Sequence, residues 1–392
     1  MPNAKSIALI ERFCTGDDLS TYDPYDIWKT DLGIGIKSLY NCNRYLGALP
    51  ASALMVIDLY ANNRARVCYR KKEYPIVRSL AALSLLTVYG RSRQEKYLRL
   101  AKEHIEWLLK NYCDGYHGLG WGLGFAWPVS CGLAYDANTP LSTATPYALE
   151  ALVDYSNLTG SNEFLASIAR VYDFFESDIK VVRESESSIA TSYGPTRDRV
   201  VTNAVSYAMY SYCMLLPFVS ATEKLSVESK IIKLYSFVTS QQSEDGSWLY
   251  SPDGNSFIDC FHSCIVLKNI IKSSRIFPLP YSDAVVSKGY QYLVKNLYDP
   301  THGLFKRFSR KNKPSLVKFD LYDNAEMLNL AQLTGDRSLA ESLQEVIRRT
   351  FHDGSDIYSQ IDIFGKKQNK NMLRWAVMPY VYALSQCDEV TP

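Results

Sequence analysis

Six long apolar stretches recur along this chain, and each follows a polar segment that contains glycine and aromatic residues. Their spacing of about 60 residues is typical of a repeated supersecondary unit. The apolar stretches begin near Pro75, Ser142, Val200, Phe257, Phe319 and Asn371. More amphipathic stretches alternate with them, at residues 51–69, 94–112, 162–177, 223–241, 281–296 and 337–350. A helical hairpin of this kind cannot bury its apolar face alone, so it stacks on its neighbours. We therefore predict an all-α (α/α)6 toroid, with one helix series lining a closed ring and the other covering its outside.

The short turns between paired helices support this repeat. Residues 158–161 read Leu-Thr-Gly-Ser, residues 333–336 read Leu-Thr-Gly-Asp, and a glycine also occupies position 90. Glycine ends a helix readily because it tolerates the left-handed conformation, and Ser or Asp caps the helix that follows. We predict that Gly90, Gly160 and Gly335 each end a helix.

Length and composition constrain the class of protein. We expect residues 49–392 to form the toroid as one domain and residues 1–48 to form an N-terminal extension that packs on it. A net charge of +2 without a long basic run argues against a nucleic-acid partner. No apolar run approaches the ~18–20 residues of a membrane span, and the N-terminus lacks the features of a signal peptide. Nine cysteines without a regular spacing favour reduced thiols. The sequence thus predicts a cytoplasmic protein without a membrane span, and its oligomeric state stays open.

Long connections lead from each outer helix to the next inner helix. They occupy residues 113–141, 178–199, 242–256, 298–318 and 352–370, and they are rich in aromatic residues. Loops of more than ~12–15 residues are usually functional or disordered, and aromatic richness argues against disorder. All five loops enter inner helices at their N-termini, so they converge on one face of the ring. We place the candidate site at this face.

Aromatic side chains in these loops are candidate platforms for a ligand: Trp121, Trp127, Trp248 and Tyr250. Flat rings stack on the C–H faces of sugars, and they also stabilise isoprenoid carbocations by cation–π attraction. The polar residues near these rings are therefore needed to distinguish a sugar ligand from an isoprenoid ligand.

Asp259 and His262 are the strongest catalytic candidates. They are three residues apart at the predicted start of an inner helix, so both side chains lie on one helical face that points to the mouth of the ring. Histidine titrates near neutral pH and is the usual general acid or base.

Other polar residues near the mouth complete the candidate site. Tyrosine can donate a proton and glycoside hydrolysis needs a second carboxyl group, so Tyr193, Tyr322 and Asp323 are further catalytic candidates. Asp320 is expected to cap the inner helix that begins near it. The remaining candidates for substrate binding are His117, Asp245, His302, Arg307 and Arg374. Zinc and Walker-type motifs do not occur in the sequence, and we expect no metal and no cofactor.

Short motifs along the chain resemble a known family. They are Tyr22–Asp26, the Gly120–Trp127 loop, Thr139–Pro140, Asp245–Trp248, Ile258–His262 and Arg374–Trp375. In this order they resemble the VpsJ-like bacterial polysaccharide biosynthesis proteins, which are encoded with exopolysaccharide and O-antigen genes and whose relatives are sometimes labelled δ-aminolevulinic acid dehydratase. The resemblance runs nearly end to end and implies the six-hairpin toroid that many glycosidases, lyases and sugar epimerases share. One departure is Tyr322, where the family pattern has a histidine.

Together these features predict a carbohydrate-active protein of surface-polysaccharide biosynthesis, acting on a glycan or glycan-lipid substrate as a uronate epimerase or lyase. His262 or Tyr250 would be the base, Tyr193 or Tyr322 would protonate the other face, and Arg307 or Arg374 would hold the carboxylate.

Three alternatives stay open. A glycoside hydrolase would pair Asp245 or Asp259 with Asp323. A non-catalytic glycan-binding module needs the aromatic residues alone. A terpene cyclase-like enzyme is suggested by the Gln-to-Trp element at residues 241–248.

Overall fold

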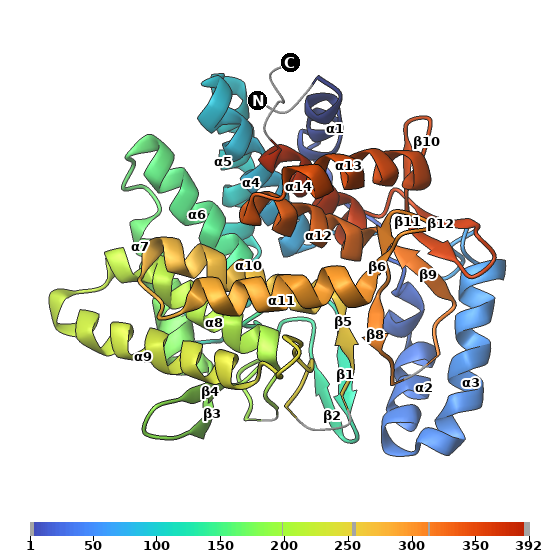
Figure 1. Cartoon of the computed structure of the whole chain (residues 1–392), viewed down its shortest axis with the longest axis horizontal. Coiled ribbons are helices and arrows are strands. Elements are labelled where there is room, and N and C mark those ends of the chain that lie inside the picture. The colour runs from blue at the N-terminus through green and yellow to red at the C-terminus, as the bar shows by residue number, and fades with distance from the viewer. Residues whose placement is uncertain (1–3, 198, 253–255, 313, 388–392) are drawn as a thin grey trace.

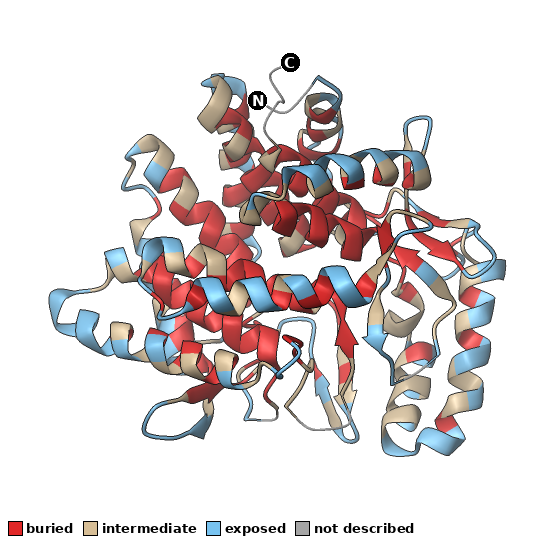
Figure 2. Ribbon diagram, in the orientation of Figure 1, coloured by how far each residue is buried: buried red, intermediate tan, exposed pale blue. Residues whose placement is uncertain are grey.

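Six inner helices form a closed ring in the computed structural model, which describes residues 4–197, 199–252, 256–312 and 314–387. They are α4 (Pro75–Ser92), α6 (Thr145–Thr159), α8 (Thr202–Leu215), α10 (Cys260–Ile276), α12 (Leu321–Thr334) and α14 (Met378–Gln386). Each contacts the next, and α14 contacts α4, so the ring is complete (Figure 1). The inner helices are buried on nearly all sides because neighbours surround them (Figure 2). The predicted all-α (α/α)6 toroid is confirmed.

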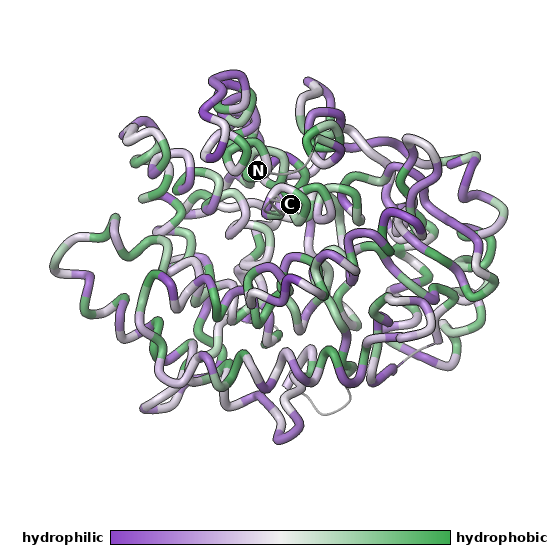
Figure 3. Tube along the Cα trace, turned by 45° about the horizontal axis from the view of Figure 1, so that its top comes forward, coloured by the Kyte–Doolittle hydropathy of each residue, from purple (hydrophilic) through white to green (hydrophobic). Residues whose placement is uncertain are grey.

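The outer helices are α5 (Glu95–Lys110), α7 (Leu165–Asp173), α9 (Ala221–Ser240), α11 (Ser282–Leu297) and α13 (Arg337–Phe351). Each packs on an inner helix with an apolar stripe and turns its charged residues outward. In α13, for example, Leu343, Ile347 and Phe351 are buried at helical spacing. The alternation of hydrophilic and hydrophobic residues along these helices can be followed in Figure 3.

The sixth outer helix is not the one that we predicted. Residues 51–69 do not form a single helix on the ring. Instead α3 (Arg44–Val56), extended by the π-helical turn η2 (Ile57–Ala61), packs against α2 (Asp31–Cys42). The outer position is filled by α1 (Ala4–Cys14), which contacts both α14 and α4 and buries Ile10 and Phe13. The predicted boundary at residue 48 therefore falls inside α3.

The starts of the inner helices agree with the sequence patterns. The starts of α4, α6, α8, α10 and α12 lie within three residues of their predicted positions. The last unit begins with the π-helical turn η5 (Leu373–Val377) before α14. Gly160 and Gly335 end their helices at φ values of 67° and 79°, as predicted. Gly90 does not, because α4 continues to Ser92 and Arg93 takes the left-handed position.

The long loops fold into short antiparallel strands that the sequence analysis did not anticipate. The pairs are β1 (Trp127–Ser130) with β2 (Leu133–Tyr135), β3 (Val181–Glu184) with β4 (Ile189–Thr191), β5 (Ile258–Asp259) with β8 (Phe308–Arg310), and β6 (Tyr298–Asp299) with β7 (Leu304–Phe305). A further sheet contains β9 (Val317–Asp320), β10 (His352–Asp353), β11 (Asp356–Asp362) and β12 (Lys367–Lys370). These strands bring loop residues from different units together above the inner helices.

Several outer helices end in the same way. A tight turn follows the helix, and the chain then pairs back on itself, as between Cys113 and Gly120 or between Gln242 and Trp248. This pairing directs a large apolar side chain into the core beneath the loop. The side chains so placed are Trp121, Trp248, Phe305 and Ile357. An Asp-Gly or Asp-Pro dipeptide lies in each of these turns, at residues 114–115, 245–246, 299–300 and 353–354, and it therefore marks a structural anchor that repeats around the ring.

A disulfide joins Cys42, at the end of α2, to Cys131, in the turn between β1 and β2. Both residues are exposed, and they lie 89 positions apart in the sequence. The prediction that all cysteines are reduced is therefore wrong for this pair, because two exposed segments that are distant in sequence meet there.

Candidate active site at the mouth of the ring

The Asp259–His262 pair lies at the N-terminal end of α10. Pairing of β5 with β8 fixes the backbone of Asp259, and His262 follows in the first helical turn. The His262 Nδ1 atom lies 2.7 Å from Asp259 Oδ2, and Asp259 is 2% exposed. An ionised carboxylate accepts this hydrogen bond from Nδ1–H, which fixes the ring orientation and leaves Nε2 as the basic nitrogen. The predicted placement of both side chains on one helical face agrees with this geometry.

Aromatic rings surround His262 on several sides. Its ring centroid lies 4.5 Å from that of Tyr250 and 3.8 Å from that of Phe261, and Phe257 stacks on Tyr250 at 4.7 Å. A small cavity beside the pair is also lined by Thr202. The imidazole therefore lies at the edge of a partly dehydrated, aromatic pocket.

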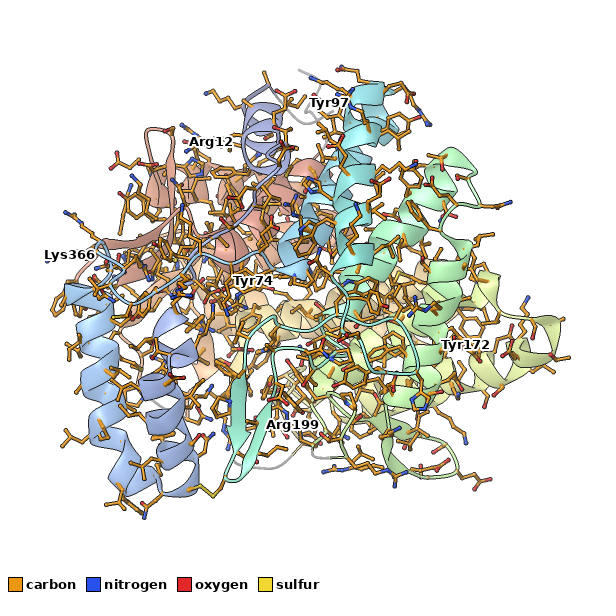
Figure 4. The ribbon with its side chains drawn as sticks, turned by 180° about the vertical axis from the view of Figure 1, so that it is seen from behind. Arg12, Tyr74, Tyr97, Tyr172, Arg199 and Lys366 are labelled. Carbon is orange, nitrogen blue, oxygen red and sulfur yellow. A yellow bond between two sulfur atoms is a disulfide. The ribbon has the colours of Figure 1, made fainter. Side chains whose placement is uncertain are left out.

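Arg199 connects this pocket to Tyr193. Its guanidinium lies 4.3 Å from the centroid of the Tyr193 ring and hydrogen bonds with Tyr250. Tyr193 in turn stacks on Tyr135 and receives a hydrogen bond of 3.2 Å from Thr143 Oγ1. Burial raises the pKa of Tyr250, so its phenol stays protonated at neutral pH. The predicted residues Tyr193 and Tyr250 are thus brought together with the Asp259–His262 pair, and Arg199 is a member that the sequence analysis missed. It is labelled near the β1–β2 hairpin in Figure 4.

Asp320 organises the centre of the mouth. It caps α12 by accepting from the Tyr322 backbone N–H at 2.9 Å, as predicted. It also accepts from Trp375 Nε1 at 3.0 Å, from Gln360 Nε2 at 3.0 Å and from Arg307 Nη1 at 3.1 Å. Such a saturated carboxylate serves to hold its donors in place. Arg307, predicted to bind substrate, is therefore already paired with Asp320.

Asp323, three residues after Asp320 in the first turn of α12, is fully buried. Its Oδ1 atom accepts from the Phe261 backbone N–H at 3.1 Å, whereas Oδ2 has no hydrogen-bond partner. Burial raises the pKa of Asp323 well above its usual range; Arg307 opposes this shift and Asp320 adds to it. The buried site therefore favours the protonated form of the Asp323 carboxyl group.

Tyr322 lies below the mouth rather than in it. Its ring stacks on Trp375 at 4.3 Å, and its hydroxyl lies within hydrogen-bonding reach of Tyr147, which itself hydrogen bonds with Tyr207 at 2.5 Å. Burial raises the pKa of Tyr322 well above its ordinary value. These contacts place Tyr322 in a buried tyrosine network between α6, α8 and α12.

A charged cluster from the N-terminal segment forms the other side of the mouth. Asp23 pairs with Arg374 and lies 3.6 Å from Lys29 Nζ, which also donates to Asp26 at 2.9 Å and to the Tyr74 hydroxyl at 2.8 Å. Burial lowers the pKa of Lys29, with Asp23 opposing the shift. Among these residues only Arg374 was predicted from the sequence to belong to the site. The Tyr22–Asp26 motif was the available signal, since it formed part of the family resemblance.

The predicted tryptophans divide between core and mouth. Trp121 is fully buried and donates from Nε1 to the Leu108 carbonyl at 2.9 Å. Trp248 is 3% exposed and donates to the Val238 carbonyl at 2.9 Å. Both are core residues without a free ring face, so their predicted position as exposed platforms is wrong. Trp127 is only partly buried and lies at the mouth with the Lys37 ammonium against its ring.

Three other predicted residues lie in the outer layer. His117 pairs with Asp178, the last residue of the π-helical turn η3 (Phe174–Asp178) that follows α7. Asp245 is exposed, and it accepts from the Ser247 N–H and hydroxyl as a turn residue. His302 pairs with Asp299 in the β6–β7 turn. Their expected convergence at the mouth is not what the structure shows, because each is held in the turn that follows an outer helix.

Among the described residues, no group of three or more His, Cys, Asp or Glu side chains is arranged to hold a metal ion. Nor is any helix in the described ranges long and apolar enough to cross a membrane.

Solved structures that resemble this chain include a cellobiose 2-epimerase from Bacillus thermoamylovorans B4167, at 13% identity and a TM-score of 0.60, covering 80% of this chain and 87% of that chain. A GH76 α-mannanase from Bacteroides thetaiotaomicron matches at 12% identity and 0.58, covering 93% and 97%. A polysaccharide lyase matches at 11% identity and 0.55, covering 91% and 97%. The chain shares their six-hairpin fold. No protein-family model and no curated protein sequence matches it.

Proposed function

We propose that this protein is a carbohydrate-active enzyme of the VpsJ-like kind, which acts on an acidic glycan of a surface polysaccharide as an epimerase or lyase. The observation that carries the proposal is the Asp259–His262 pair, in which a buried carboxylate orients an imidazole at the mouth of the ring. Structures with the same fold include an epimerase, a lyase and a mannanase, which supports a carbohydrate substrate.

In this proposal His262 Nε2 removes the proton from C5 of a uronic acid. The C–H electron pair moves into the adjacent carboxylate to form an enediolate, which a nearby cation stabilises. Arg199 is best placed for this role, because it lies between Tyr193 and Tyr250 beside the pair. Arg307 and Arg374 pair with Asp320 and Asp23, at the centre and on the other side of the mouth respectively.

Two outcomes follow from the same enediolate. In an epimerase, Tyr193 donates its proton to C5 from the opposite face and the configuration is inverted. In a lyase, the enediolate collapses and expels the oxygen substituent at C4, so a C4–C5 double bond forms. Both reactions need the same base and the same cation. The epimerase delivers the second proton to C5, whereas the lyase breaks the C4–O bond and delivers that proton to the leaving oxygen.

Hydrolysis is the second candidate, and Asp323 favours it. A carboxylic acid whose pKa is raised by burial, as that of Asp323 is, can protonate a leaving glycosidic oxygen, and Asp259 would be the second carboxylate. Asp323 is fully buried, however, which favours the His262 mechanism.

The Cys42–Cys131 disulfide bears on where the protein acts. Such bonds persist in oxidising compartments and are rare in the bacterial cytosol. This pair therefore supports a site of action outside the reducing cytoplasm, in place of the cytoplasmic location that the sequence predicted.

The test is incubation of the purified chain with uronate-containing oligosaccharides in D2O. Deuterium at C5 detected by NMR would support the epimerase, and an unsaturated non-reducing end would support the lyase. A new reducing end with neither change would identify a hydrolase. Binding with no chemical change would reject the enzyme in favour of a glycan-binding module, and binding of isoprenoid diphosphates alone would favour the terpene cyclase-like alternative.

A further inference from the structure

An apolar surface covers the α2–α3 hairpin, which stands beside the ring (Figure 1). More than half of the large apolar side chains that the described chain exposes lie between residues 32 and 67. They include Leu46 at 65%, Leu49 at 80% and Tyr45 at 93% exposure. Figure 2 shows α3 mostly in the colours of exposed and intermediate residues. The members are Leu32, Leu39, Tyr45, Leu46, Leu49, Val56, Ile57, Tyr60 and Val67, hereafter the hairpin surface.

The exposed apolar residues of α3 and of the first position of η2 form a stripe along one side of the helix. At 100° per residue, Tyr45, Leu46, Leu49, Val56 and Ile57 all fall within roughly 120° of the helix circumference. This is the width of a face that packs against something apolar. A second element extends the face, because the Phe364 ring lies 6.2 Å from that of Tyr60. A contiguous apolar patch of this kind marks an interaction site.

The charges around the hairpin surface are almost all positive. Asp31 is exposed at the start of α2, but no further Asp or Glu occurs up to residue 57, and Arg44 is exposed at the start of α3. The loop that returns to the ring exposes Arg64, Arg70, Lys71 and Lys72. Asp58 is buried there against the Tyr69 hydroxyl, so it adds no exposed negative charge.

We propose that the hairpin surface docks on an anionic lipid bilayer, with its apolar residues in the interface and its basic rim on the headgroups. Apolar faces flanked by Lys and Arg bind membranes in this way without spanning them. A second copy of the chain is a poorer occupant, because a two-fold interface would bring the same basic groups against each other. An anionic surface complements both the apolar stripe and its rim.

The hairpin surface lies beside the mouth of the ring. Asn63 Nδ2 donates to Asn369 in β12 at 2.8 Å, and Arg44 Nη2 donates to the Asn312 carbonyl in the β8–β9 loop at 2.9 Å. The α2 helix packs on β1 and is tied to the β1–β2 turn by the Cys42–Cys131 disulfide. Docking therefore places the mouth near the headgroups, where a lipid-linked acidic glycan would present its sugars. This choice of substrate rests on the proposed function, whereas membrane docking does not.

Vesicle cosedimentation of the full chain tests the proposal. The probes are vesicles of phosphatidylcholine alone and of phosphatidylcholine with about 30% phosphatidylglycerol. We expect binding to the anionic vesicles, weakened by salt because the basic rim is screened. The Leu46→Glu/Leu49→Glu variant should bind about tenfold more weakly or worse. Its matched control is Leu225→Glu on α9, where the leucine is 77% exposed on the outer layer, and that variant should bind like the wild type.

Three results would overturn the docking proposal. One is equal sedimentation with neutral and anionic vesicles. Another is equal loss in the Leu225→Glu control. The third is a dimer by light scattering that Leu46→Glu/Leu49→Glu converts to a monomer without any vesicle binding. The same variants, assayed on a soluble acidic oligosaccharide, should keep wild-type turnover. The His262→Ala variant should lose turnover on that substrate and still bind vesicles. This result would show that the proposed function and membrane docking can fail independently.

Discussion

Two Asp–His pairs with the same spacing lie in different regions of the molecule. Asp259 and His262 lie at the mouth, 2.7 Å apart, with the His262 side chain 19% exposed. Asp299 and His302 lie in the outer β6–β7 turn, 3.2 Å apart, with the His302 side chain 39% exposed. The His262 ring packs against Tyr250 and Phe261. The His302 ring contacts Asp299 on one side, and its Nε2 atom lies 3.1 Å from the Lys318 ammonium. The i, i+3 spacing alone thus does not distinguish a candidate base from a surface contact. The distinction comes from the position of the pair, at the start of an inner helix or in a turn after an outer helix.

The largest expected effect separates the two histidines. His262→Ala should lower turnover about 10²–10⁴-fold, because a general base contributes that much. His302→Ala should leave turnover within about twofold, since the outer turn does not touch the mouth. Steady-state rates on a uronate oligosaccharide measure both. Equal losses in the two variants would reject the distinction.

The carboxylates give the second test. Asp259→Asn should lower kcat about 10²-fold or more, because an amide does not fix the imidazole with Nε2 as the base or stabilise its charged form. Asp299→Asn is the matched control and should leave kcat unchanged. An unchanged kcat in Asp259→Asn would show that the carboxylate does not act through His262.

A third histidine, His104 on the outer helix α5, should make the stability of the fold depend on pH. His104 accepts from Arg78 at Nδ1 and donates from Nε2 to the Cys14 carbonyl, so the neutral ring satisfies both contacts. Burial lowers the pKa of His104 to about 4. As the pH falls, His104 therefore binds a proton near pH ~6.5 in the unfolded chain but only near pH 4 in the folded chain. Stability from this group is complete above pH ~6.5 and falls by about 3 kcal/mol as the pH drops towards 4.

Urea unfolding at pH 7 and at pH 4.5 measures this loss. His104→Gln should show a smaller loss between the two pH values, whatever its stability at pH 7. His302→Gln should keep the wild-type loss. An identical pH dependence in wild type and His104→Gln would contradict the prediction.

The smallest expected effect is a difference in stability between substitutions of the buried Trp121 and of the partly exposed Trp127. Trp121→Phe removes the indole donor to Leu108 and leaves that carbonyl buried, which should lower the free energy of unfolding by about 1–3 kcal/mol. Trp127→Phe, at a partly exposed position, should change it by less than about 0.5 kcal/mol. Thermal unfolding followed by circular dichroism is the measurement. A reversed order would place the structural anchor at Trp127.

The inner helices could be predicted because each is apolar on nearly all sides and is preceded by a polar loop. The predicted start at Pro75 coincides with that of α4. The Asp259–His262 contact was predictable for the same reason, since both residues lie within one helical turn. Local spacing determines these features.

Contacts between distant segments could not be predicted in this way. Asp23 meets Arg374 across 351 positions, and no local pattern in either segment reveals the other. The role of Trp121 was wrong because a loop position suggested exposure, while the pairing of Cys113 with Gly120 turns the indole inward. The amphipathic pattern of residues 51–69 predicts an outer helix of the ring, but their apolar residues lie on the exposed face of the α2–α3 hairpin.

The ring is closed by the contact of α14 with α4, and this has a consequence for folding during translation. The Arg91 guanidinium, at the end of α4, binds the Ser385 carbonyl at 3.0 Å across 294 positions, and α1 packs on both α4 and α14. Contacts of such high sequence separation form late and slow folding. While the ribosome is still making the sixth hairpin, the faces of α4 and α12 that α14 will cover remain open to water. A nascent chain that stops before Met378 would leave both faces without a partner, and such surfaces attract chaperones and proteases.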